Sequence, residues 1–338
     1  MLRLTLILSI AAGACTAVPA PERRLVERTQ VAMGSQLRLA AWTADEAATL
    51  AAFDGVFREF ERLEALLSVW RNGSDVLRLN AGAGETPIAV SDDTIEVLTA
   101  AKEAGDRTQG KFDITFGALA DLWKFDHDQD NVIPDRRSVE ARLPLVDYTQ
   151  VQVDRAAGTA FISRRGARIH LGGIGKGYAI DRAIALLRER GLADFLIQSG
   201  GDLYVSGRND DRPWKLGIQD PRGAEGTSFA TIEAANATVS TSGDSERFFI
   251  KDGTRYHHLL DPDRGEPARL CRSVTIVATR AILADALSTG VFILGPAAGM
   301  ALVESMPGVE AVIVSAENAV TISSGLQGKV TLLAPPAP

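Results

Sequence analysis

The sequence predicts an α+β fold, because segments with strand and helix patterns follow one another without strict alternation. Residues 50–67 carry apolar side chains at helical spacing. Residues 248–250 and 255–260 flank an Asp252-Gly253 pair, which is typical of a β-hairpin. The 338 residues are 46% hydrophobic, so the chain has enough apolar material for one large domain or two ordinary ones.

The beginning of the predicted domain contains an interrupted strand-like segment and a helix. Residues 25–42 have a strand-like pattern that is interrupted at residues 33–35 (MGS). Thr43 is followed three residues later by Glu46, which matches a capping box. We therefore expect a helix to begin at Thr43 and to bury the apolar face that ends at Leu67.

A second helix and a second hairpin are expected before the middle of the chain. Ser91 is a candidate N-cap for a helix that carries apolar residues between positions 95 and 101. The segment around Trp70, between the two helices, has the composition of a loop. Residues 148–154 and 160–163 form a predicted hairpin.

The hairpin leads to a glycine-rich turn near the middle of the chain. A predicted strand at residues 167–171 precedes four glycines, and a helix with its apolar face at residues 180–187 follows them. Gly191 is the expected C′ residue of that helix. The four glycines are Gly172, Gly173, Gly175 and Gly177.

A glycine turn between a strand and a helix can bring backbone N–H groups close to an anion. Lys176 adds a positive charge there, so we interpret the turn as a diphosphate-binding site. It is neither a Walker A loop, because Gly177 follows Lys176, nor a Rossmann fingerprint, because the glycine spacing is wrong. A tight turn without a ligand is the alternative.

The second half of the chain is predicted to contain several strands and one long helix. The helix spans residues 282–294 and is stopped by Gly295 and Pro296. The proline-rich tail that ends the chain is expected to be loose. The predicted strands span residues 195–199, 203–205, 237–242, 311–314, 319–322 and 330–333.

Composition excludes several classes of protein. The formal net charge of −7 argues against a nucleic-acid-binding protein, which needs a basic surface. Four histidines and two cysteines, with no Cys-x-x-Cys motif, do not suit a zinc cluster. No Gly-x-Ser-x-Gly elbow is present, so a serine hydrolase has little support.

The N-terminus has the pattern of an export signal. Arg3 precedes an apolar run at residues 4–12, which is too short to span a membrane. Small residues then precede Cys15, as in a bacterial lipoprotein signal, although simple cleavage after Ala14 also fits. We expect a signal at residues 1–14, a tether at residues 15–23 and one domain at residues 24–334. Cys15 would anchor the protein by a lipid on the periplasmic side of the inner membrane, in the bacterial cell envelope.

Two oxygen-bearing side chains are spaced for a metal ion. Asp285 and Thr289 lie four residues apart on the predicted C-terminal helix, so both oxygens leave one helix face. A carboxylate and a hydroxyl are hard ligands that suit Mg²⁺. The alternative is structural, with Asp285 near the helix start favouring the helix dipole and Thr289 packed in the core.

Adjacent histidines form another candidate. His257 and His258 lie on a predicted strand, so their side chains point to opposite faces and only one can enter a site. A neutral histidine near a hydroxyl can act as a general base. A lone strand histidine can equally be a structural group, and spacing alone does not choose between these roles.

Seven segments in order resemble the ApbE family, whose members are flavin transferases. They cover about residues 30–295, which is most of the mature chain. The segments are 32–35 (AMGS), 111–115 (KFDIT) with 122–125 (LWKF), 171–182 (LGGIGKGYAIDR), 198–202 (QSGGD), 239–244 (VSTSGD), 255–262 (RYHHLLDP) and 284–289 (ADALST).

The resemblance implies a T-fold-like α+β architecture, with mixed and mostly antiparallel sheets packed against helices. It implies FAD as the donor substrate and Mg²⁺ at the diphosphate. Asp285 and Thr289 match metal-binding positions, and the backbone carbonyl of Gly173 is the implied third ligand. His258, not His257, matches the catalytic histidine.

Further positions match FAD-binding residues of the family. His170 departs from the pattern, because the family usually has aspartate there, so any contact of His170 with the nucleotide must differ from that of a carboxylate. The matching residues are Met33, Trp70, Lys111, Phe112, Asp113, His170 and Lys176.

The implied reaction is Mg²⁺-dependent transfer of FMN from FAD to a threonine hydroxyl of an acceptor protein, with release of AMP. The implied acceptor is a membrane-associated redox subunit. A Mg²⁺-dependent FAD pyrophosphatase would use the same residues, and a flavin-binding lipoprotein without turnover is a third alternative.

Overall fold

The computed structural model describes residues 22–126, 128–224 and 226–338, and it confirms the α+β class. An eight-stranded sheet in the order β1-β2-β6-β7-β10-β15-β16-β17 forms its centre, and every pairing in it is antiparallel. The strands are β1 (Arg24–Ala32), β2 (Ser35–Thr43), β6 (Phe195–Ser199), β7 (Asp202–Ser206), β10 (Ala237–Gly243), β15 (Cys271–Ala278), β16 (Glu310–Ser315) and β17 (Val320–Ile322).

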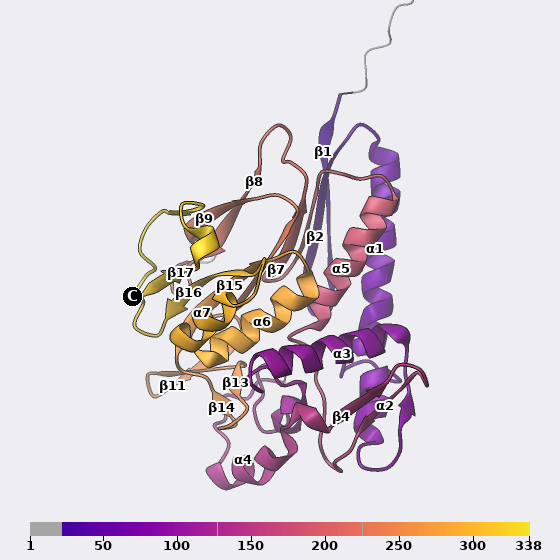
Figure 1. Ribbon diagram of the computed structural model, residues 1–338, viewed down its shortest axis with the longest axis vertical. Helices are drawn as coiled ribbons and strands as arrows, with labels where there is room; N and C mark the ends of the chain where they lie inside the picture. The colour runs from indigo at the N-terminus through magenta and orange to yellow at the C-terminus, as the bar shows by residue number, and fades with distance from the viewer. Residues whose placement is uncertain (1–21, 127, 225) are drawn as a thin grey trace, which may run out of the picture.

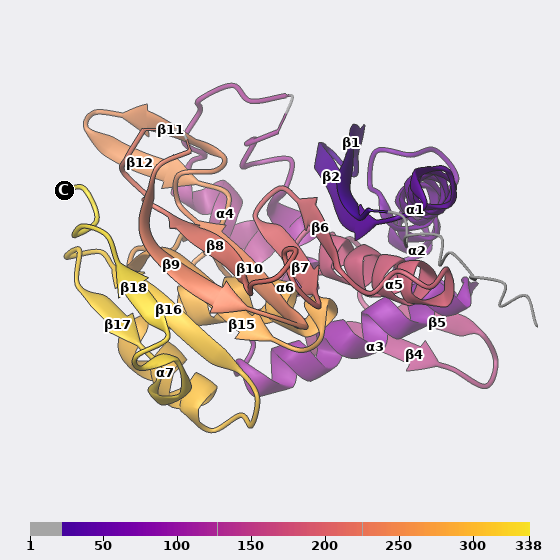
Figure 2. The ribbon, with the colours of Figure 1, turned by 90° about the horizontal axis from the view of Figure 1, so that it is seen from above.

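Helices cover one face of this sheet, as Figures 1 and 2 show. They are α1 (Glu46–Leu67), α5 (Gly175–Glu189), α6 (Ala281–Leu294) and α7 (Pro296–Glu304). Strand β16 shows that both faces of the sheet are buried. Ala311 and Ile313 face the helices, whereas Val312 and Val314 belong to a cluster on the opposite side. This period of two is that of a strand covered on both sides.

A three-stranded sheet in the order β18-β9-β8 covers the opposite face. Strand β8 (Trp214–Gln219) alternates buried and exposed residues, and it pairs with β9 (Ser228–Ala234). Strand β18 (Val330–Leu332) joins β9 from the end of the chain. Of these strands only β18 was predicted; β8, β9 and the central strand β15 were missed, although the alternation in β8 is a strand signal.

A smaller part of the molecule packs beside the helical layer (Figure 1). Its longest helix, α3 (Asp92–Arg107), contacts α6, and a short sheet in the order β3-β5-β4 accompanies it. The other elements are α2 (Asp75–Ala81), α4 (Arg136–Arg142), β3 (Ile88–Ala89), β4 (Val151–Asp154), β5 (Thr159–Ile162) and the 3₁₀ helices η1 (Ile114–Leu119), η2 (Leu143–Leu145) and η3 (Tyr148–Gln150). A fourth 3₁₀ helix, η4 (Ser324–Leu326), lies near the C-terminus.

Local turn chemistry was predicted correctly at several places. Met33 and Gly34, between β1 and β2, have φ values of 50° and 69°. Asp252 and Gly253, between β11 (Phe248–Lys251) and β12 (Thr254–His257), have φ values of 51° and 73°. Positive φ at both central residues is what a type I′ turn, the common two-residue hairpin turn, requires. Gly191, with φ 79°, follows the C-cap of α5 as expected.

The predicted capping box at Thr43 is wrong. The N-cap of α1 is Asp45, whose Oδ1 accepts a hydrogen bond of 2.9 Å from Ala48 N. Thr43 still lies in β2, and its hydroxyl accepts a hydrogen bond from Asp45 N at 3.0 Å. A carboxylate at the helix N-terminus also favours the helix dipole, which accounts for the later start.

The predicted strand at residues 167–171 is also wrong, because this segment joins no sheet. Ile169 N donates to Asn80 Oδ1 at 2.7 Å, and Asn80 Nδ2 donates to Ile169 O at 3.0 Å. His170 N donates to Ile114 O at 2.8 Å. One side-chain amide on α2 thus supplies the donor and the acceptor that a neighbouring strand would have supplied.

The C-terminal tail is fixed rather than loose. Pro336 is buried, and its carbonyl accepts a hydrogen bond of 2.7 Å from Asn318 Nδ2. Ala337 N donates to Asp220 Oδ2 at 2.9 Å, and Ala337 O accepts from Arg272 at 3.1 Å. These side-chain partners come from distant parts of the chain, so the composition of the tail did not reveal them.

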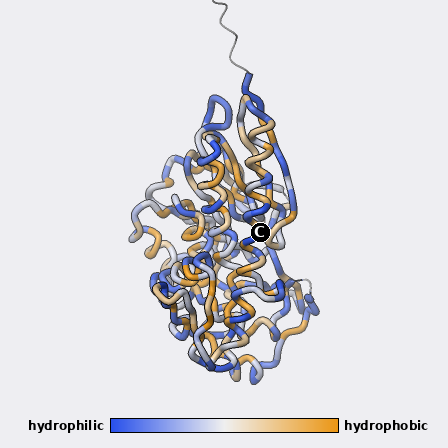
Figure 3. The backbone as a smooth tube through the Cα atoms, turned by 90° about the vertical axis from the view of Figure 1, so that its right-hand side faces the viewer, coloured by the Kyte–Doolittle hydropathy of each residue, from blue (hydrophilic) through white to orange (hydrophobic). Residues whose placement is uncertain are grey.

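The expected signal and the candidate lipidation site at Cys15 lie outside the described residues. Among the described residues, no helix is long and apolar enough to span a membrane. The hydrophobic stretches in Figure 3 are short and interrupted by hydrophilic residues. Cys271 is a buried, free thiol.

Candidate functional site

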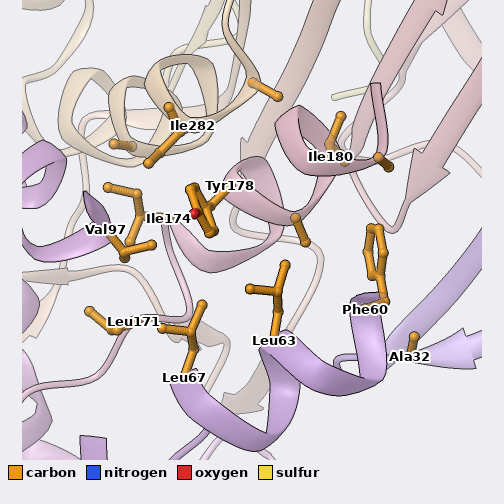
Figure 4. Close-up of a cluster of buried hydrophobic side chains, with 14 of the residues drawn as sticks. Ala32, Phe60, Leu63, Leu67, Val97, Leu171, Ile174, Tyr178, Ile180 and Ile282 are labelled. Carbon is orange, nitrogen blue, oxygen red and sulfur yellow. The ribbon is translucent and has the colours of Figure 1, made fainter. Parts of the chain in front are cut away.

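The glycine turn is fixed between two helices. A Cβ atom added to Gly177 would lie 2.3 Å from Ala281 O, so only glycine allows α5 and α6 to meet here. Asp181 accepts hydrogen bonds from Ala281 N at 2.8 Å and Ile282 N at 3.0 Å, so it caps α6 and is structural. Figure 4 shows the apolar support for this turn, including Ile174 and Tyr178.

The three residues that carry the candidate metal ligands belong to this junction. Asp285 and Thr289 lie one turn apart on α6, and a Cβ added to Gly173 would lie 3.5 Å from Thr289 Oγ1. Asp285 is 4% exposed, and its Oδ2 accepts a hydrogen bond of 2.8 Å from Gly177 N. Burial and the nearby Asp202 carboxylate raise the pKa of Asp285 to about 8, against the opposing effects of Lys176 and the Gly177 N–H.

The chemistry of these three ligands fits Mg²⁺ bound together with a substrate. A carboxylate, a hydroxyl and a carbonyl all provide hard oxygen ligands. Within the described part of the chain, no group of three or more His, Cys, Asp or Glu side chains could hold a metal ion. Mg²⁺ sites commonly use one or two carboxylates and leave the other positions to waters and substrate phosphates.

Neighbouring hydroxyls orient Thr289. Ser242 Oγ, at the end of β10, lies 3.2 Å from Thr289 Oγ1 and 2.8 Å from Ser288 Oγ. Ser242 lies in the family-like segment 239–244, but no sequence pattern indicated a role for its hydroxyl. Its position on a strand that ends beside α6 is a tertiary feature, so sequence spacing could not reveal it.

Lys176 lies beside the metal candidates and forms an ion pair with Asp202. Asp202 is 2% exposed and also accepts a hydrogen bond from Ser240 Oγ, so this network holds Lys176 in place. Burial by itself would lower the pKa of Lys176. The carboxylates of Asp202 and Asp285 outweigh this effect and raise the pKa above its ordinary value. Lys176 therefore carries a positive charge at neutral pH and can attract an anion.

The expectation that the glycine turn frees backbone N–H groups for an anion is wrong for four residues of the turn. Gly172 N donates to His170 Nδ1 at 3.0 Å, and Gly175 N donates to Leu171 O at 2.8 Å. The N–H groups of Ile174 and Gly177 also donate within the protein. A bound anion would depend more on Lys176 and a metal ion than on these four amides.

The two adjacent histidines diverge as predicted. His257 is 2% exposed, its Nε2 lies 2.8 Å from Ala268 O, and its ring meets Phe292 edge-on at 5.5 Å. His258 points away from this core and keeps partial exposure, and its Nδ1 lies 3.3 Å from Arg247 O. β12 ends at His257 rather than extending to residue 260. His257 therefore has a structural role in the core, and His258 is the histidine that can contact a ligand.

The surroundings of His258 favour a neutral ring with a defined tautomer. Desolvation, followed by the charge of Arg247 and smaller effects of His257 and Lys176, holds the pKa of His258 well below its usual range. Because Nδ1 faces the Arg247 carbonyl, we assign the ring proton to Nδ1. Nε2 then has a lone pair that can accept a proton.

Two of the candidate FAD-binding residues flank the glycine turn. Met33 Cε lies 3.8 Å from the position of a Cβ on Gly175, and Phe112 Cε2 lies 3.3 Å from the corresponding position on Gly173. Met33 is held by its N–H, which donates to Glu64 Oε2 at 3.0 Å. Trp70, which is 56% exposed, lies on the loop between α1 and α2.

Lys111 and Asp113 already have strong partners within the fold. Lys111 Nζ lies 2.7 Å from Asp261 Oδ1 and 2.7 Å from Asp263 Oδ2. Asp113 accepts hydrogen bonds from Thr115 N at 2.7 Å, Thr115 Oγ1 at 2.5 Å and Tyr148 N at 2.9 Å. These contacts fix the backbone on both sides of Phe112. Burial nevertheless raises the pKa of Asp113.

His170 differs chemically from the aspartate that is usual at its position. Its Nδ1 accepts a hydrogen bond from Gly172 N, and its ring lies 5.3 Å from that of Phe116. Burial, assisted by the charge of Arg247 and opposed by that of Asp126, lowers the pKa of His170 to about 4. The ring is therefore neutral and its Nε2–H is a donor, whereas a carboxylate would be a charged acceptor.

Comparison with known proteins agrees with this arrangement. The model of the ApbE family matches residues 33–313. A protein of Treponema pallidum named FAD:protein FMN transferase is 32% identical over 326 residues, which are 92% of this chain and 90% of that protein. The protein of the same name from Escherichia coli K12 is 31% identical and covers 69% of this chain and 68% of its own length.

Solved structures agree as well. The crystal structure of the ApbE protein of Thermotoga maritima has a TM-score of 0.83 and 31% identity, covering 90% of this chain and 99% of that one. The flavin transferase ApbE of Vibrio cholerae has a TM-score of 0.81 and 25% identity, with 91% and 99% covered. The chain therefore belongs to the ApbE family of flavin transferases.

Proposed function

We propose that this protein transfers FMN from FAD to a threonine hydroxyl of an acceptor protein, with Mg²⁺, and releases AMP. The observation that carries the proposal is the state of His258. Its ring is neutral and its Nδ1 is directed at the Arg247 carbonyl, which leaves Nε2 as a base on the side away from the core. The names of the relatives support the donor and the transferred group.

The reaction follows from these groups. Nε2 of His258 takes the proton from the threonine hydroxyl as its oxygen attacks the phosphorus of the FMN half. The phosphorus–oxygen bond to AMP breaks, and AMP leaves with the electron pair. Lys176, held by Asp202, provides positive charge where negative charge builds up on the phosphates.

Asp285, Thr289 and the carbonyl of Gly173 are the residues that would hold Mg²⁺. When bound, Mg²⁺ would neutralise phosphate charge as a Lewis acid. Ser242 orients the Thr289 hydroxyl for this role, and the Gly177 N–H orients the Asp285 carboxylate.

A product assay tests this function. The purified protein is incubated with FAD, Mg²⁺ and a candidate acceptor, and the acceptor is analysed by mass spectrometry. The expected result is an acceptor that carries one FMN on a threonine, with one AMP released for each. Free FMN and AMP with an unmodified acceptor would indicate a pyrophosphatase, and no AMP would indicate a flavin-binding protein.

The location is part of the proposal. We propose that the protein is exported and anchored through a lipid on Cys15, so that its acceptor is a redox subunit of the membrane, reached from the periplasmic side. The short apolar run and the small residues before Cys15 support this. A Cys15→Ser variant should move from the membrane to the soluble fraction after cell fractionation. Wild-type protein that stays in the cytoplasm with Met1 retained would contradict export.

A further inference from the structure

Arg247 lies beside His258, and the reaction described above uses its backbone carbonyl but not its side chain. It is the residue before β11, directly opposite the end of β12. Its carbonyl accepts a hydrogen bond of 3.1 Å from His258 N and lies 3.3 Å from His258 Nδ1. The backbone of Arg247 therefore positions His258, and its side chain starts from the rim of the same site.

The Arg247 guanidinium forms an ion pair with a neighbouring loop. Its NH1 atom lies 2.5 Å from Asp126 Oδ1, and both side chains remain partly exposed. An exposed pair of this kind contributes little net stability. Lys176 differs in this respect, because its partner Asp202 is buried and fixed by a second hydrogen bond. Arg247 can therefore exchange its partner at low cost, whereas Lys176 is held.

The loop and the hairpin that carry this ion pair are packed together by four aromatic rings. The ring centroids lie 5.8 Å apart for Trp123 and Phe125, 6.0 Å for Trp123 and Tyr256, 5.7 Å for Phe125 and Phe249, and 5.3 Å for Phe249 and Tyr256. This aromatic contact keeps the backbone of residue 247 in place, so that only its side chain has to move to change partner.

The charge of the guanidinium acts on three groups of the site that come from different elements. Its positive charge contributes to the lowered pKa values of His258, just after β12, and of His170, before the glycine turn. It also opposes in part the raised pKa of Lys176, at the start of α5. The negative charge of Asp126 acts on His170 in the opposite direction. Arg247 thus adds a cation on the residue that contacts His258, at the edge of the site where the diphosphate of FAD is proposed to lie.

We infer that Arg247 is a further phosphate-binding residue of this site, and that its guanidinium leaves Asp126 to bind the diphosphate of FAD. This inference rests on the proposed function, because it takes FAD as the donor. A planar guanidinium can bind two phosphate oxygens at once, and such charge-assisted pairs are stronger than an exposed single contact with a carboxylate. Asp126 then competes with the diphosphate for the guanidinium. When FAD is absent, Asp126 keeps the Arg247 side chain in a defined position.

Binding measurements on four single variants and one double variant test the inference. Arg247→Gln keeps the backbone carbonyl that holds His258 and removes the charge. We expect it to weaken FAD binding by about 10- to 100-fold, the loss typical of a hydrogen bond to a charged group. Riboflavin, which has no phosphate, should bind as it does to the wild type. Arg247→Lys should recover part of the loss, because it restores the charge without the planar fork.

Asp126→Asn tests the exchange itself. Removing the competitor should tighten FAD binding by roughly two- to fivefold, in line with a weak exposed ion pair. The same change in the Arg247→Gln background should have no effect. Lys251→Gln is the matched control, because it removes one positive charge from the exposed end of the same hairpin. It should leave FAD affinity within about twofold.

The outcomes are distinct. Unchanged FAD affinity in Arg247→Gln would overturn the inference, as would an equal loss in Lys251→Gln, which would indicate a general charge effect. An equal loss of riboflavin and FAD affinity would also overturn it, because displacement of the hairpin would then be the cause. Wild-type protein that binds no FAD would overturn the proposed function itself, whatever Arg247 does. Melting curves of all variants show whether the fold is kept.

Discussion

The carboxylate of Asp285, on α6, accepts a hydrogen bond of 2.8 Å from the backbone N–H of Gly177, on α5. This contact joins the candidate metal ligand to the helix that begins in the glycine turn. It has two consequences. One Asp285 oxygen is oriented by the backbone, and the approach of the two helices requires glycine at position 177.

Asp285→Ala should reduce transfer by at least about 100-fold through loss of Mg²⁺ binding, because Asp285 is the only charged group among the three candidate ligands. Thr289→Val should have a milder effect, since a hydroxyl is a weaker ligand. Activity is titrated against Mg²⁺ for each variant. Wild-type activity of Asp285→Ala at low Mg²⁺ would show that the metal assignment is wrong.

Gly177→Ala should lower the free energy of unfolding by about 1–3 kcal/mol or more, as overpacking of a tight contact does. The added methyl group would lie 2.3 Å from Ala281 O and 2.7 Å from Asp285 Cβ. Gly175→Ala is the matched control in the same helix, because its methyl group would meet only Met33 Cε, at 3.8 Å. Urea titration compares the two variants, and equal stability would contradict the close packing of α5 and α6.

His258→Ala should lower single-turnover transfer by about 10²–10⁴-fold, the usual contribution of a general base, with little change in FAD affinity. His257→Ala should change transfer by less than about tenfold. It should instead lower the free energy of unfolding by about 1–3 kcal/mol, because it removes the buried partner of Ala268 O. A large loss of transfer in His257→Ala alone would move the catalytic assignment to His257.

Metal binding should depend on pH through Asp285. Since the pKa of Asp285 is raised to about 8, the carboxyl is protonated at lower pH, and a metal ion must displace that proton. We expect the apparent Mg²⁺ affinity to rise about tenfold per pH unit up to about pH 8 and then to level off. Calorimetry at several pH values measures this, and a flat profile between pH 6 and pH 8 would contradict it.

The raised pKa of Asp285 should also affect the stability of the protein without metal. A raised carboxyl pKa favours the protonated form in the folded state, so its contribution is fully present below the ordinary value of 3.8 and is lost as pH rises through about 8. Asp285→Asn cannot ionise and should lack this part of the pH dependence. Melting temperatures in EDTA across this range, for wild type and variant, provide the check.

The sequence by itself determined the features that depend on neighbours along the chain. The Met33-Gly34 and Asp252-Gly253 turns, the N-cap at Ser91 and the end of α5 at Gly191 were all predictable, because each reflects the backbone preference of one or two residues. The divergence of His257 and His258 followed from the alternation of a strand. The order of the matching segments likewise pointed to the family that the comparisons confirm.

Only the tertiary structure decided which partner each polar group has. Lys111 and Asp113 are predicted to bind FAD, and the structure adds that Lys111 pairs with Asp261 and Asp263, and that Asp113 accepts hydrogen bonds from backbone amides. The amide of Asn80 replaces a strand beside Ile169, and Gly177 N is used by Asp285 rather than left for an anion. Most of these partners lie far apart along the chain. The packing of the helices and sheets brings these partners together, and a pattern among neighbouring residues cannot predict contacts between distant parts of the chain.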